Sequence, residues 1–213
     1  MFVEWSTCND KNHLKGVNFP TNILYAKTLE SIGEIYGDES LIARAQQIKN
    51  KIIEIGFDGE FFADNAVRVN GKLVRCADHL SETCQYYALF FGVKTEWQFK
   101  RKMMEEFGPM RKDDTYSQVG KSNMFIGYYL RFFWLLKEKE NQRVIDETLQ
   151  IFYPMATLTG TLWEHHDSHA SCNHGFTSVI AVVLLRALLG FKEVKDGKLV
   201  FDENFIKNKE NTF

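Results

Sequence analysis

Residues 124–136 read Met-Phe-Ile-Gly-Tyr-Tyr-Leu-Arg-Phe-Phe-Trp-Leu-Leu and carry one charged side chain, Arg131. A helix that is apolar almost all round is stable in water only where other elements enclose most of its surface. Residues 176–190 and 84–91 have the same character, and residues 23–36, which follow Pro20 closely, are a fourth candidate. These segments are predicted to be inner helices.

The segments between them are amphipathic and are predicted to be outer helices. Residues 39–55 place apolar side chains on one stripe, and residues 95–107 add a capping box at Thr95 and Gln98 before a similar stripe. Residues 140–152 repeat this pattern. The stripes consist of Leu41, Ala45, Ile48, Ile52 and Ile55, then Phe99, Met103 and Phe107, then Val144, Thr148, Leu149 and Phe152.

The alternation of inner and outer helices decides the predicted fold class. In a four-helix bundle every helix would be amphipathic, so strict alternation favours helical hairpins arranged around an axis. We therefore predict an all-α protein, a partial α/α barrel of about seven helices over residues 1–190. One or two β-hairpins are expected, with turns at Asn70-Gly71 and Asp196-Gly197. Residues 191–213 would form the second hairpin and a frayed tail.

Composition excludes several classes of partner. The 213 residues have a formal net charge of −2, which offers no electrostatic footprint for nucleic acid or an anionic membrane. The longest apolar run, residues 179–189, is interrupted by Arg186 and is too short to cross about 30 Å of hydrocarbon.

The four cysteines are scattered along the chain without a CxxC pair, which favours free thiols. No signal-peptide pattern is present, so we expect a cytoplasmic location by default, or a periplasmic or secreted one within a longer enzyme.

Polar residues gather where the chain enters the predicted inner helices. These entries are Glu4-Trp5, residues 78–82, residues 121–123 and residues 163–174. In an α/α barrel the inner helices run parallel, so their entries would meet at one end. We predict the functional site there.

The entry at residues 163–174 is the richest in chemistry, with a Trp-Glu pair and four histidines. Sugar rings stack on indoles, and sugar hydroxyls need both donors and acceptors. Glu164 is the preferred catalytic carboxylate, although a glutamate at a helix entry can also serve the helix N-terminus. Glu82 follows the expected N-cap Ser81 directly, so it too could be a site carboxylate or could serve the helix N-terminus. For Glu82 the helix N-terminal role is favoured. Trp5 and Trp163 are candidate sugar platforms, whereas Trp97 and Trp134 are expected in the core.

A zinc site is an alternative for the same segment, with His165, His169 and His174 as ligands and Asp167 and Cys172 close by. The segment is not expected to be regular helix before Asn173, so the four-residue spacing does not place two histidines on one face. No second cluster supplies further ligands. We expect neither a metal nor another cofactor.

Five segments, taken in order, resemble the C-terminal half of the six-hairpin barrel of bacterial α-L-rhamnosidases, glycoside hydrolase family 78. They are residues 2–5, 18–25, 81–87, 160–164 (Gly-Thr-Leu-Trp-Glu) and 171–174 (Ser-Cys-Asn-His). The resemblance implies an inverting hydrolase of a rhamnoside-like carbohydrate. It also implies that Glu164 is the general base, that His174 contacts sugar hydroxyls and that Trp5 lines the pocket. With Glu82, Trp163 and His165 these are the candidate site residues.

The chain departs from the family pattern at Glu4, where aspartate is usual, and at Gly160, where threonine is common. The family's general acid lies in an upstream segment that does not occur here, so this role is expected to fall outside the chain. Seven helices also make about half of a twelve-helix barrel, which would expose apolar helices along an open edge. We therefore expect the C-terminal part of a larger glycosidase, a truncated open reading frame, or a fragment that covers the edge by association with the missing N-terminal half or with itself. The alternative is a non-catalytic helical module that binds carbohydrate or a partner.

Overall fold

The computed structural model describes residues 16–112, 114–122, 124–165, 171–202 and 205. The chain forms two compact units, Met1–Arg131 and Phe132–Phe213. The boundary between them falls within helix α5. The expected domain boundary at residue 190 stays a prediction.

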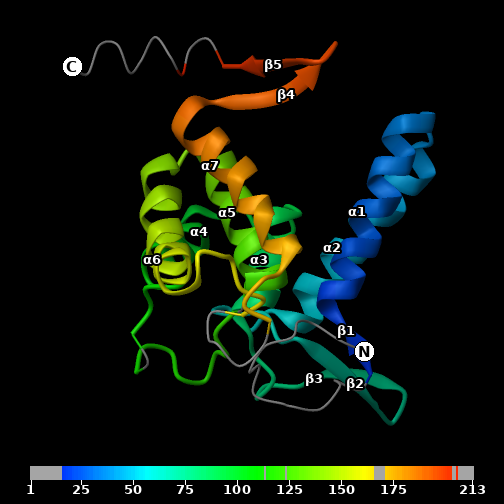
Figure 1. The fold of residues 1–213 in the computed structure, drawn as a ribbon. Coiled ribbons are helices and arrows are strands. Elements are labelled where there is room, and N and C mark those ends of the chain that lie inside the picture. Colours follow the sequence, from blue (N-terminus) through cyan, green and yellow to red (C-terminus); the bar gives the residue numbers. More distant parts are fainter. Residues whose placement is uncertain (1–15, 113, 123, 166–170, 203–204, 206–213) are drawn as a thin grey trace. The chain divides into compact units, whose positions relative to one another are not determined.

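The first unit contains a helical hairpin, α1 (Phe19–Tyr36) and α2 (Glu39–Gly56), whose helices lie side by side (Figure 1). Gly37 ends α1 with φ 69°, and Asp38 caps α2 by accepting a hydrogen bond from the Ser40 N–H at 2.9 Å. A Cβ at Gly33 would lie 2.7 Å from Ile42 Cγ1, so glycine permits the close approach of the two helices.

A small antiparallel sheet flanks this hairpin in the chain, with strand order β1 (Val17–Asn18), which precedes α1, then β2 (Asn65–Val69) and β3 (Lys72–Arg75), which follow α2. The turn between β2 and β3 has positive φ at both Asn70 and Gly71, as predicted for this dipeptide. Strand β1 was not predicted, because two residues are too few to show an alternating pattern.

Helices α3 (Glu82–Phe90) and α4 (Trp97–Glu105) come next, followed by a π-helix, η1 (Met124–Tyr128), that leads directly into α5 (Tyr129–Lys137). Helix α3 is enclosed as predicted, with Cys84, Tyr86 and Ala88 all inaccessible to solvent. The capping box predicted at Thr95 is wrong. Glu96 takes the N-cap position without a side-chain cap, and its carboxylate accepts from the Thr95 N–H and from Lys94 instead.

The second unit contains the rest of α5, then α6 (Asn141–Thr159), a 3₁₀ turn η2 (Gly175–Ser178) and α7 (Val179–Leu189). Helices α6 and α7 pack against each other. Helix α6 continues past Pro154, and its buried residues are Val144, Glu147, Thr148, Ile151, Phe152 and Met155. Leu149 was expected among them but is 54% exposed, because it lies one residue, about 100°, round the helix from Thr148.

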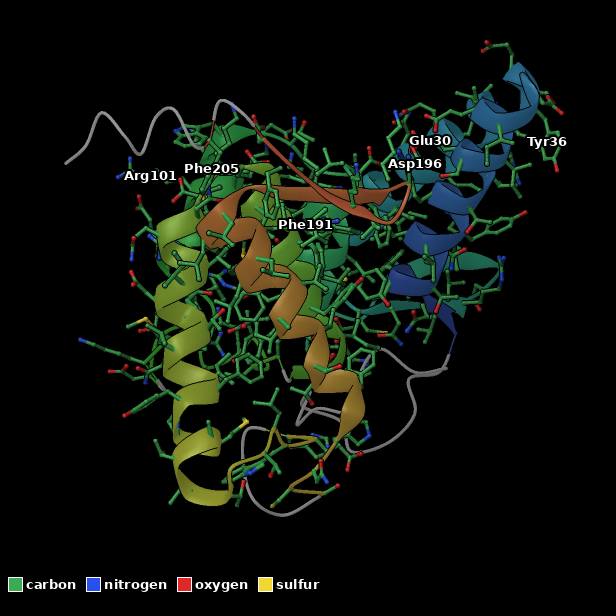
Figure 2. All side chains as sticks on the ribbon, turned by 45° about the horizontal axis from the view of Figure 1, so that its top comes forward. Glu30, Tyr36, Arg101, Phe191, Asp196 and Phe205 are labelled. Carbon is green, nitrogen blue, oxygen red and sulfur yellow. The ribbon has the colours of Figure 1, made fainter. Side chains whose placement is uncertain are left out.

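Strands β4 (Phe191–Lys195) and β5 (Lys198–Phe201) form the second predicted hairpin, with Asp196 at its tip (Figure 2). Trp134 is 1% exposed, as expected for a core residue. Trp97 is 63% exposed, so its assignment to the core is wrong.

The described part of the chain is therefore all-α, with seven α-helices and two small antiparallel sheets, which confirms the predicted fold class. Among these helices none has the length and apolar character needed to span a membrane.

Candidate functional site

In the first unit, the entries to α1 and α3 are joined through Asp64. The Phe19 N–H at the start of α1 donates to the Asp64 carbonyl oxygen at 2.9 Å. The Ser81 hydroxyl, at the N-cap of α3, donates to Asp64 Oδ1 at 2.6 Å. Asp64 and Ser81 are both buried. These bonds hold the two helix starts beside each other.

The entry to η1 and α5 joins the same group. The Gly120 N–H donates to the Leu80 carbonyl oxygen at 2.8 Å, and the Glu82 N–H donates to the Gly120 carbonyl oxygen at 2.9 Å. The hydroxyls of Thr83 and Ser122 lie 2.8 Å apart. The starts of α1, α3 and η1 therefore lie close together in the first unit.

Glu82 lies at this end, and its side chain is fully buried. Its Oε1 is 3.0 Å from Arg111 Nε, and its Oε2 accepts a hydrogen bond from the Tyr86 hydroxyl at 3.0 Å. Burial raises the pKa of Glu82, while Arg111 and Arg131 lower it in part. A carboxylate without exposed surface can affect a ligand only through its neighbours, so these contacts fit the structural interpretation of Glu82.

His79 is a half-buried polar residue of the same entry. Its Nδ1 lies 2.8 Å from Asn65 Oδ1, which indicates that the proton is on Nδ1. The sequence drew attention to His79 but not to Asp64 or Asn65. These two residues lie well before the entry in the chain, and their only local signal is a polar pair at the start of strand β2.

In the second unit, the segment carrying Trp163 and Glu164 pairs with the segment that ends at His174. The Glu164 N–H donates to the Ser171 carbonyl oxygen at 2.8 Å, and the His174 N–H donates to the Leu162 carbonyl oxygen at 2.9 Å. The Thr161 hydroxyl donates to the Cys172 carbonyl oxygen. We call residues 161–164 and 171–174 the clip.

The clip is anchored to its neighbouring helices. The Thr177 hydroxyl, buried in η2, donates to the Trp163 carbonyl oxygen at 2.8 Å. Trp163 Nε1 donates to Thr159 Oγ1 at 2.8 Å, which ties the clip to the end of α6. The clip is therefore held between the end of α6 and the start of η2 and α7.

The predicted site residues of the clip differ in exposure. Trp163 is 8% exposed, whereas Glu164, His165 and His174 are half-buried. Glu164 Oε2 accepts a hydrogen bond from the Ser171 N–H at 3.2 Å, which orients the carboxylate. The structure thus brings Glu164 and His174 onto the two paired segments of one clip.

Some predicted residues lie outside the described part of the chain, and the others are divided between the two units. Trp5 lies outside the described residues, as do Asp167 and His169 of the zinc hypothesis. Within the described residues there is no group of three or more His, Cys, Asp or Glu able to hold a metal ion. Glu82 and Glu164 belong to different units, and the gathering of all candidates in one site stays a prediction.

Comparison with known proteins adds one finding. No protein-family model and no curated protein matches the chain. Among solved structures, it is similar to a family 78 glycoside hydrolase, a rhamnosidase from Bacillus sp. GL1, with a TM-score of 0.64 and 16% identity. The fold is glycosidase-like. The match covers 89% of this chain and 21% of that enzyme, so the chain spans about a fifth of its length.

Proposed function

We propose that this chain is a glycoside hydrolase module of the α-L-rhamnosidase type in which Glu164 is the general base. The observation that carries the proposal is the clip. It holds an oriented, half-exposed carboxylate on the segment that pairs with the His174 segment, ahead of an apolar helix, in a fold similar to that of a rhamnosidase. The substrate class is a rhamnoside-like carbohydrate.

In an inverting reaction, a carboxylate removes a proton from water as the water attacks the anomeric carbon. The opposite carboxylic acid, about 6.5–9.5 Å away, protonates the leaving oxygen. The hydrogen bond from the Ser171 N–H holds one oxygen of Glu164, and the partial exposure of the side chain gives water access to the carboxylate. We assign the general acid to no residue of this chain and propose that polypeptide outside it supplies this group.

The remaining candidates are given supporting roles in this proposal. His165 and His174 would contact sugar hydroxyls, because an imidazole provides both a donor and an acceptor. Trp163, being mostly buried, would offer only its exposed edge to a sugar and would chiefly position the Glu164 backbone. Trp5 would line the pocket, and Glu82 would act through Arg111.

The alternative is a non-catalytic helical module that binds carbohydrate or a partner. It is favoured by the small share of the similar enzyme that this chain spans. Such a module would use the same clip to bind a sugar but would not hydrolyse it.

A substrate whose leaving group needs no protonation separates the two functions, because it makes the general acid unnecessary. We expect the 213-residue chain to hydrolyse 2,4-dinitrophenyl α-L-rhamnoside slowly and with inversion. Glu164→Gln should lower the rate about 10²–10⁴-fold, the usual contribution of general base catalysis. Added azide should restore turnover in this variant, because azide attacks carbon without a base.

Glu193→Gln is the matched control, since Glu193 is exposed on β4 and lies outside the clip. Its rate should equal that of the unchanged chain. Equal rates for the unchanged chain and Glu164→Gln would refute the role of Glu164. Binding of rhamnose without hydrolysis of the activated substrate would establish the non-catalytic alternative.

A further inference from the structure

One face of α1 is exposed and has no charged side chain. Its members recur at helical spacing, and all of them are exposed: Thr21, Leu24, Tyr25, Thr28, Ile32, Ile35 and Tyr36. Ile35 is 75% exposed and Tyr36 80%, and Tyr36 projects from the C-terminal end of the helix (Figure 2). We call these seven residues the α1 face.

The charged residues of α1 lie on another stripe. Lys27, Glu30 and Glu34 follow one another at spacings of three and four. Glu30 pairs with Lys27 at 2.6 Å and with Lys49 of α2 at 2.8 Å. Lys27 and Glu30 are therefore engaged within the hairpin, whereas the α1 face makes no ion pair.

The threonine hydroxyls of the α1 face have partners within their own unit. The Thr21 hydroxyl donates to Asn18 Oδ1 at 2.8 Å, and the Thr28 hydroxyl donates to the Leu24 carbonyl oxygen at 2.9 Å. Neither threonine needs a polar group from a partner. Apart from the hydroxyls of Tyr25 and Tyr36, the face is apolar, so the surface that covers it should be largely apolar and uncharged.

We propose that the α1 face pairs with the α1 face of a second copy of this chain, about a two-fold axis. A two-fold interface brings the same patch from both copies together, so a patch without charge meets itself without repulsion. An antiparallel pairing centred on Thr28 places Leu24 of one copy opposite Ile32 of the other. Threonine at the centre also allows the two helices to approach closely.

The size of the face suits such a dimer. The large side chains of the α1 face are two tyrosines and three aliphatic residues, and about 40–80% of the surface of each is exposed. An aromatic side chain can bury roughly 150–250 Å² and an aliphatic one somewhat less, so the exposed area of the five amounts to roughly 500 Å² per copy. They are Leu24, Tyr25, Ile32, Ile35 and Tyr36. Two facing copies then bury roughly 1,000 Å², the lower limit for a specific interface. The pairing is therefore expected to be reversible and to depend on protein concentration. It does not depend on the proposed function.

Sedimentation of the full chain between about 1 and 100 µM tests the proposal across the range expected for a small interface. A dimer should form within this range. Ile32→Glu should weaken the dimer at least about 100-fold, because each copy would bury an unpaired charge. Leu158→Glu is the control. Leu158 is a 72% exposed residue of α6 outside the α1 face, and its substitution should leave the dimer unchanged.

Mixing two variants tests the antiparallel register. Leu24→Lys and Ile32→Glu should each weaken self-association, whereas an equal mixture should form a heterodimer, because the introduced lysine of one copy then faces the introduced glutamate of the other. Far-ultraviolet circular dichroism should show that both variants keep their helical content. A chain that stays monomeric throughout, a dimer that tolerates Ile32→Glu, or a mixture that stays monomeric would overturn the proposal.

Discussion

Gln85→Leu is expected to destabilise the first unit more than any ordinary surface change. Gln85 is inaccessible to solvent, and its side-chain amide bridges α3 to the chain before β2. Its Nε2 donates to the carbonyl oxygens of Phe62 and Ser81 at 2.8 and 2.9 Å, and its Oε1 accepts from the Phe62 N–H at 2.8 Å. Leucine keeps the approximate volume but makes none of these bonds.

The magnitude follows from the groups left behind. Phe62 is 0% exposed, so both its N–H and its carbonyl oxygen would lose this partner away from water. Each buried unsatisfied group costs about 1–3 kcal/mol, which makes the expected loss about 2–6 kcal/mol. Folded domains are stable by only about 5–15 kcal/mol, so this one change would remove a large part of the total.

Urea unfolding followed by circular dichroism measures the loss. Hydrogen exchange of peptides covering residues 57–65 assigns it to this unit, since a chain of two units need not unfold in a single step. Gln142→Leu is the matched control. The Gln142 amide bonds to Asp146 on the exposed surface of α6, so its loss should cost less than about 0.5 kcal/mol. If Gln85→Leu changed stability no more than this control, the bridging role of Gln85 would be wrong.

Three further predictions concern the clip, a pH dependence and a close contact. Thr177→Val should lower the free energy of unfolding by about 1–3 kcal/mol, because the buried Trp163 carbonyl oxygen loses its hydrogen-bond donor. Hydrogen exchange in residues 161–165 should become faster. Unchanged exchange there would contradict the anchoring of the clip. Partial burial raises the pKa of Asp58, but the N–H groups of Phe61 and Glu60 and the Arg75 guanidinium together lower it further than burial raises it. Because the folded pKa lies below the unfolded one, the ionised Asp58 stabilises the fold above about pH 4, and this contribution is lost as the pH falls through the folded pKa. The difference between the urea midpoints measured at neutral and at acid pH should therefore be smaller in Asp58→Asn than in the unchanged chain. Gly127→Ala should lower thermal stability by about 1–3 kcal/mol, because the new Cβ would overlap the Ser122 side chain and lie 2.8 Å from Thr83 Oγ1; an unchanged melting temperature would show that η1 shifts freely.

Features that depend on neighbours in the chain could be predicted from the sequence. The predicted helix at residues 39–55 is α2, and both predicted hairpin turns occur at their dipeptides. An apolar stripe at helical spacing and a pair of residues that tolerate positive φ are local properties, so no distant contact is needed to read them. The predicted start of α4 was wrong, because Thr95 and Glu96 are adjacent polar residues and the local sequence does not specify which of them is the N-cap.

The sequence by itself also determined the chemistry available to the candidate site, since Trp163, Glu164 and His174 stand close together in one segment. Only the tertiary structure decided what each residue can reach. It paired Glu82 with Arg111, bonded Asp64 to Ser81, and left Trp97 exposed while burying Trp134. Burial and ion pairing depend on which surfaces meet after the chain folds back on itself, and residues far apart in sequence carry no local pattern that specifies this.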